Sequence, residues 1–92
     1  MTYALICTDK PGAIELRKAN RDAHLAYFEE TGVVVLAGPF LDDTGEMCGS
    51  LLLLDVSSKN EAETWAAGDP YGKAGLFDSV TIREWKKVRG GI

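Results

Sequence analysis

Four consecutive leucines, Leu51 to Leu54, lie inside an apolar run that extends from Ser50 to Val56. A strand with one face in water alternates apolar and polar side chains, because successive residues point to opposite faces of a sheet. This run has no such alternation, so we expect both of its faces to be covered. One cover can come from helices of the same chain, and a second sheet is the natural candidate for the other.

Turn and cap residues divide the rest of the chain into alternating elements. Runs rich in β-branched and apolar residues indicate strands, and a long stretch without glycine or proline indicates a helix. Ser58-Lys59-Asn60-Glu61 has the spacing of a capping box, in which the serine and glutamate side chains satisfy each other's backbone N–H groups. The expected elements are a strand over Thr2–Thr8, a helix from Ala13 to about Thr31, strands over Val33–Ala37 and Ser50–Val56, a helix from Ser58 to Gly68, a loop over Asp69–Gly75, and a strand over Phe77–Val88.

The resulting order, β-α-β-β-α-β, predicts an α+β protein of the ferredoxin-like type. In this arrangement one four-stranded antiparallel sheet carries both helices on the same face. The chain has 92 residues, too few for two independent cores, so we expect residues 1–92 to form a single domain.

Composition excludes several classes of protein. The formal net charge of −4 argues against binding to nucleic acid, which needs clustered lysine and arginine. Cys7 and Cys48 are far apart and lack the spacing of a disulfide framework or a zinc site. The first residues lack the pattern of a secretion signal, and no segment has the length to span a bilayer. We therefore expect a cytoplasmic protein without a membrane partner.

A polar stripe interrupts the face of the long helix that should belong to the core. It consists of Arg17, Asn20, Arg21 and His24. Polar groups cost free energy when they are buried without partners. Either the stripe faces a polar cleft, or the helix is rotated and these residues lie in water. Histidine is the side chain that exchanges protons most readily near neutral pH, which makes His24 a candidate acid or base.

Asp69 and Ser50 are the other candidates that the sequence offers. Asp69 precedes Pro70, and its carboxylate could simply cap a turn or could approach the imidazole of His24 and fix its tautomer. Ser50 could donate a hydrogen bond to a ligand, but no G-x-S-x-G motif surrounds it, so a nucleophilic role is weakly supported. Nucleotide fingerprints and clusters of metal ligands are missing from the sequence, so we expect no cofactor and no metal.

Several short motifs together resemble the YciI-like (YCII-related) family. They are Arg21-x-x-His24-Leu25, Gly38-Pro39, Gly49-Ser50 and Trp65-x-x-x-Asp69-Pro70-Tyr71-x-x-Ala74-Gly75-Leu76, followed by Trp85-Lys86. Each motif is weak alone, but their order and spacing are fairly specific. The resemblance covers nearly the whole chain.

The resemblance implies a homodimeric α/β barrel in which two ferredoxin-like sheets face each other. It also implies an active site built on His24 and Asp69, with Arg21, Ser50 and Tyr71 lining the same cleft. The implied chemistry is proton transfer on small aromatic or lactone-like substrates, of the lyase, isomerase or dehydrochlorinase type, without a metal or cofactor.

Two other functions are compatible with the same residues. The cleft could bind a small ligand without converting it. Some dimeric α/β barrels bind haem through a helix histidine, so a role in haem handling is a further alternative.

Overall fold

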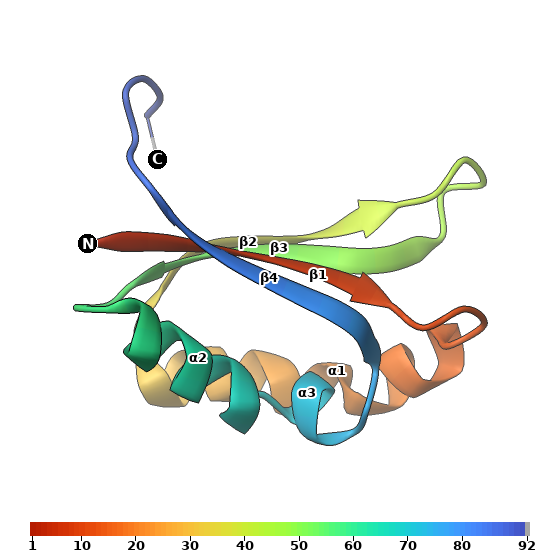
Figure 1. Cartoon of the computed structure of the whole chain (residues 1–92). Helices are drawn as coiled ribbons and strands as arrows, with labels where there is room; N and C mark the ends of the chain where they lie inside the picture. The colour runs from red at the N-terminus through yellow and green to blue at the C-terminus, as the bar shows by residue number, and fades with distance from the viewer. Residues whose placement is uncertain (92) are drawn as a thin grey trace.

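Strands and helices alternate along the chain much as the sequence predicts. The structure, a computed structural model, describes residues 1–91. Its elements are β1 (Thr2–Asp9), α1 (Ile14–Thr31), β2 (Val34–Leu41), β3 (Met47–Asp55), α2 (Lys59–Gly68), α3 (Pro70–Lys73) and β4 (Phe77–Trp85) (Figure 1).

The strands form one antiparallel sheet in the order β2-β3-β1-β4. Figure 1 shows α1, α2 and α3 together on one side of this sheet, which leaves the opposite side open. The predicted ferredoxin-like topology is therefore confirmed. Within residues 1–91, no helix has the length and apolar character needed to cross a membrane.

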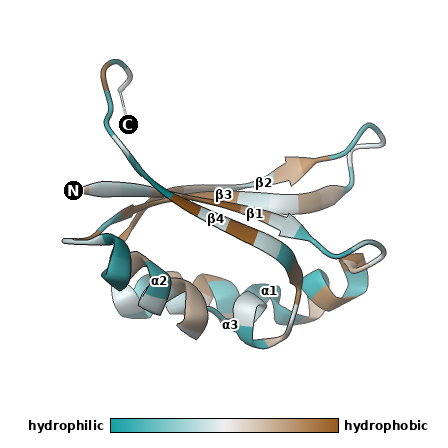
Figure 2. Ribbon diagram, in the orientation of Figure 1, coloured by the Kyte–Doolittle hydropathy of each residue, from teal (hydrophilic) through white to brown (hydrophobic). Residues whose placement is uncertain are grey.

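The leucine run of β3 divides between the two faces of the sheet. Leu52 and Leu54 are almost fully buried among the core residues beneath the helices. Leu51 and Leu53 line a hollow on the opposite, open face of the sheet. Apolar colouring is accordingly concentrated in the strands, whereas the helices carry many hydrophilic residues (Figure 2).

The strand boundaries that differ most from the sequence prediction are the end of β2, the start of β3 and the end of β4. Strand β2 continues through Gly38-Pro39 to Leu41 instead of ending at Ala37. Proline is tolerated there because β2 is an edge strand, where a missing N–H leaves no ladder bond unmade on the outer side. Strand β3 begins at Met47, so Ser50 lies inside it, and β4 ends at Trp85 instead of Val88.

The segment predicted to be a loop, 69–75, contains the short helix α3. The Asp69 carboxylate accepts a hydrogen bond from the Tyr71 N–H at 3.1 Å, and Pro70 occupies the first turn, where its missing N–H has no cost. At the start of α2, Ser58 Oγ accepts from the Glu61 N–H at 3.2 Å, as predicted. The Glu61 carboxylate, however, accepts from the N–H of Ser57, one residue earlier than in the usual capping box.

Candidate active site

The polar stripe of α1 faces the sheet. Arg17 and His24 are only 3% and 5% exposed, whereas Arg21 is exposed at the mouth of the same region. Asn20 is half-buried and donates to the Leu16 carbonyl of its own helix. The structure thus has the polar cleft that was one of the two alternatives. The other alternative, a rotated helix with these residues in water, is wrong because Arg17 and His24 are buried.

His24 and Asp69 are in direct contact, although 45 residues separate them in the sequence. His24 Nδ1 lies 2.6 Å from Asp69 Oδ1, and both side chains are buried. When Asp69 is ionised its carboxylate can only accept a hydrogen bond, so Nδ1 carries the hydrogen, and in the neutral imidazole Nε2 is then an acceptor. This arrangement fixes the tautomer and the direction of the imidazole.

Aromatic rings hold the plane of the imidazole. The ring of Tyr71 stacks on His24 with centroids 3.7 Å apart and an interplanar angle of 14°. Phe28, one turn further along α1, meets the imidazole edge-on at 4.4 Å. Burial raises the pKa of the Tyr71 phenol, and the positive charges of Arg17 and Arg21 offset part of that rise. The Tyr71 hydroxyl therefore stays neutral near neutral pH.

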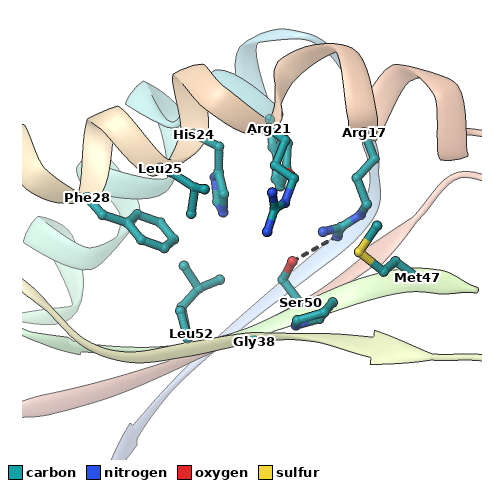
Figure 3. Close-up of a pocket in the computed structure, with 12 residues that line it drawn as sticks. Arg17, Arg21, His24, Leu25, Phe28, Gly38, Met47, Ser50 and Leu52 are labelled. Atoms are coloured by element: carbon teal, nitrogen blue, oxygen red, sulfur yellow. Dashed lines mark hydrogen bonds between the residues drawn. The ribbon is translucent and has the colours of Figure 1, made fainter.

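Arg17 is the centre of a second buried polar group. Its guanidinium binds the Asp9 carboxylate at two points, with Nε at 2.7 Å and Nη2 at 3.0 Å. Nη2 also donates to Ser50 Oγ at 2.8 Å (Figure 3). Burial alone would lower the pKa of Arg17, but the hydrogen bonds and charge of Asp9 raise it overall. Arg17 is therefore a permanent, paired cation.

Local sequence patterns did not indicate that Arg17 and Asp9 belong to the site. Arg17 was part of the polar stripe, and its position two helical turns before His24 was a signal that both residues share one face. Asp9 belongs to the segment Asp9-Lys10-Pro11-Gly12, whose composition is typical of a turn, and nothing local marks it as the partner of Arg17. Its carboxylate reaches the site because β1 ends beside the first turns of α1.

A cavity of about 170 Å³ lies between α1 and strands β2 and β3 (Figure 3). Its polar lining consists of Arg17, Arg21, His24, Ser50 and Tyr71, and its apolar lining includes Leu25, Phe28, Pro39, Met47 and Leu52. Four predicted site residues thus line one cavity. Asp69 does not line it, and lies behind the imidazole. In the described part of the chain, no three His, Cys, Asp or Glu side chains converge as metal ligands do.

The charges along the cavity are unequally compensated. Arg17 is neutralised by Asp9, and His24 is bound to Asp69. Arg21 has no acidic partner among residues 1–91. Arg21 therefore places an unpaired positive charge in the cavity lining, which favours an anionic group on a ligand.

A ferredoxin-like fold with a buried His–Asp pair beside a small polar cavity defines the class of this protein. Its family follows from a comparison with known domains. The chain belongs to the YCII-related domain family, whose model matches residues 1–86. The resemblance predicted from the motifs is thereby confirmed.

Two curated proteins and one solved structure are similar over nearly the whole chain. Protein YciI of Escherichia coli O6:H1 is 33% identical over 97 residues, which cover 96% of this chain and 99% of that protein. An uncharacterized protein of Haemophilus influenzae is 32% identical over the same shares of each chain. The 5-chloro-2-hydroxyhydroquinone dehydrochlorinase TftG of Burkholderia phenoliruptrix AC1100, in complex with 2,5-dihydroxybenzoquinone, is 34% identical with a TM-score of 0.84, and the match covers 94% of each chain.

Proposed function

We propose that this chain is an enzyme that uses His24 as an acid and base in elimination or isomerisation of small hydroxylated ring compounds. The observation that carries the proposal is the 2.6 Å hydrogen bond between buried His24 and Asp69 at the wall of the cavity. Asp69 holds the imidazole so that Nε2 is available to accept a proton from a bound molecule. Tyr71 and Phe28 restrict the ring to one orientation.

The size and polarity of the cavity favour a compound with one ring. A cavity of roughly 150 Å³ is large enough for benzene, and this one measures about 170 Å³. Ser50 accepts from Arg17, so its own hydrogen is available to donate to a ligand oxygen. Arg21 supplies charge for an ionised hydroxyl. The similar dehydrochlorinase binds 2,5-dihydroxybenzoquinone, a ring of this kind, which supports the proposal.

Dehydrochlorination of a chlorinated hydroxyhydroquinone illustrates the chemistry. First, one ring hydroxyl loses its proton while the carbon that bears chlorine gains one, which converts the ring to a keto form. A second hydroxyl then loses its proton to His24 Nε2, and chloride leaves with the electron pair of the C–Cl bond. The products are a hydroxyquinone, chloride and one proton, so the step requires no added oxidant or reductant. Arg21 and Ser50 stabilise the oxygen that carries negative charge.

Removal of the imidazole tests this proposal. With 5-chloro-2-hydroxyhydroquinone as the probe, we expect chloride release from the native chain and a fall in kcat of about 10²-fold or more in His24→Ala, the usual range for loss of a general base. Circular dichroism verifies that the variant is folded. Undiminished chloride release by folded His24→Ala would overturn the assignment of His24 as the base.

The other functions considered for this chain have less support. Passive ligand binding does not require an imidazole whose second nitrogen is held by a carboxylate. Haem is a macrocycle of four pyrrole rings, and a cavity that fits a single ring is too small to enclose it. Conversion of a small ring compound fits both the His24–Asp69 pair and the cavity size.

The proposed assembly is a homodimer in which two open sheet faces pack together. This face carries a hollow of about 420 Å³ lined mainly by apolar residues of β2, β3 and β4. Its exposed apolar side chains include Ile6, Val35, Leu36 and Trp85. Large apolar surfaces of this kind are characteristic of protein interfaces. A second copy would supply the cover that the leucine run requires.

A further inference from the structure

The Trp65 carbonyl oxygen connects the segment that carries Asp69 to the helix that carries His24. It accepts the helical hydrogen bond from the Asp69 N–H at 3.1 Å. It also accepts a bond from the Tyr27 hydroxyl at 2.9 Å. Tyr27 lies on α1, three residues after His24. One oxygen atom thus joins the backbone of Asp69 to the helix that carries its imidazole partner.

A second hydrogen bond joins the same two helices beside the first. Trp65 Nε1 donates to Thr31 Oγ1 at 2.9 Å, and the Thr31 hydroxyl donates to the Tyr27 carbonyl at 2.9 Å. The rings of Tyr27 and Trp65 lie 4.9 Å apart. The end of α2 is therefore held against α1 by rigid aromatic groups at a defined distance.

Gly68 is the residue that permits this contact. A Cβ atom at position 68 would lie only 2.5 Å from the Tyr27 hydroxyl oxygen, closer than the two atoms can approach. The backbone of Gly68 does not have a positive φ. Glycine is therefore required here for space, and not for a left-handed backbone conformation.

We propose that Tyr27 is a positioning residue whose hydroxyl sets the distance between His24 and Asp69. Tyr27 is not among the cavity-lining residues of the described chain, so it acts through Asp69 and not on a ligand. Without the hydroxyl, the last turn of α2 loses one of its two hydrogen bonds to α1, while the Tyr27 ring still packs in place. The carboxylate then moves relative to an imidazole that α1 and Phe28 continue to hold. The catalytic consequence rests on the proposed function, but the geometric claim does not.

The sequence contains a single histidine, so every imidazole NMR signal belongs to His24. In the native chain, the short bond to Asp69 predicts a Nδ1–H proton far downfield and protected from exchange with water. In Tyr27→Phe we expect this proton to shift upfield and to exchange faster. Tyr3→Phe is the matched control, because it removes a phenol hydroxyl that makes no hydrogen bond within the described residues. An unchanged His24 signal in Tyr27→Phe would overturn the proposal.

Gly68→Ala provides a second, independent variant. Its methyl group displaces the Tyr27 hydroxyl from the Trp65 carbonyl, so the variant should reproduce the shift seen in Tyr27→Phe. In the double variant the methyl occupies space that the hydroxyl has vacated, so the two effects should not add. Fully additive shifts would mean that position 68 acts by another route, which contradicts the role assigned to the hydroxyl.

Turnover of 5-chloro-2-hydroxyhydroquinone separates this inference from the proposed function. If both hold, Tyr27→Phe lowers kcat about tenfold with little change in KM, since small displacements of a catalytic group reduce the chemical step. A changed His24 signal without any turnover by the native chain would support the positioning role and reject the proposed chemistry. An unchanged His24 signal in Tyr27→Phe, together with full turnover by the native chain, would reject the positioning role and support the proposed chemistry.

Discussion

At the scale of single residues, the site contains two buried side chains that are bound to carboxylates and one exposed arginine that is not. Arg17 and His24 are buried, and each is bound to a carboxylate. In the described residues, no buried side-chain nitrogen or oxygen lacks a hydrogen-bond partner. Arg21 differs, because it borders the cavity and keeps its charge available. Its contribution should therefore be to binding an anion and not to holding the fold.

Arg21→Gln should weaken binding of an anionic substrate. We expect KM for 5-chloro-2-hydroxyhydroquinone to rise about tenfold, in keeping with the loss of one hydrogen bond to a charged group. Arg21→Lys should retain most of the affinity because it retains the charge. The control is Lys18→Gln, which removes an equal charge from an exposed position on α1 outside the cavity lining. Equal KM values for Arg21→Gln and the native chain would contradict this role.

Cys7 should be an inert thiol in the folded chain. It is 2% exposed, and burial together with the charges of Asp69 and Asp9 raises its pKa to about 12. At pH 8 we expect iodoacetamide to modify the half-buried Cys48 in native protein and to reach Cys7 only after unfolding, as mass spectrometry would report. Rapid native modification of Cys7 would be inconsistent with this burial.

The same pKa shift predicts the sign of a pH effect on stability. The thiol is protonated in both states below pH 9.0, the ordinary pKa, so its contribution to stability is complete there. As pH rises from 9.0 to about 12, the unfolded chain loses this proton first, and the contribution of Cys7 to the free energy of unfolding declines. The free energy of unfolding measured by urea titration should therefore fall more steeply with pH in the native chain than in Cys7→Ala across this window.

At the scale of elements, local signals predicted most of the helices and strands. The cap at Ser58 and the long stretch without glycine or proline located α2 and α1 within a residue or two. Strand β2 continues beyond Gly38-Pro39, where the sequence predicted its end. Pairing with β3 outweighs the local turn preference at this sheet edge. Helix α3 was missed because Asp69 followed by Pro70 is compatible with either a turn or a helix start.

Ser58→Ala should destabilise α2 by removing the acceptor for the Glu61 N–H. Loss of such a cap costs about 1 kcal/mol of the free energy of unfolding, which urea denaturation can measure. Ser57→Ala is a suitable control, since Ser57 contributes its backbone N–H and not its side chain to this cap. A similar loss of stability in both variants would argue against the cap at Ser58.

At the scale of the whole molecule, the sheet has two apolar faces and the described chain covers one of them. The helices bury Leu5, Leu52 and Leu54, whereas Leu36, Leu51 and Leu53 border the hollow on the open face. The proposed second copy would bury this surface.

Leu36→Glu should prevent formation of the proposed dimer, because it places a charge on the apolar open face. Sedimentation equilibrium should report a dimer for the native chain and a monomer for the variant. Leu16→Glu is the matched control, since Leu16 has the same 37% exposure as Leu36 but lies on α1. A native chain that sediments as a monomer would remove the dimer from the proposal.

The sequence by itself determined the order of the strands and the two longer helices, the topology and the family, because hydrophobic periodicity, caps and short motifs are properties of neighbouring residues. The residues themselves indicated His24, Asp69 and Ser50 as candidates, and the family resemblance added Arg21 and Tyr71 to the same cleft. Only the tertiary structure decided which of them meet.

The contact of His24 with Asp69, the binding of Arg17 by Asp9, and the reach of Tyr27 to Trp65 each join separate elements. Such contacts depend on how helices and strands pack, and packing distances have no counterpart in local sequence patterns.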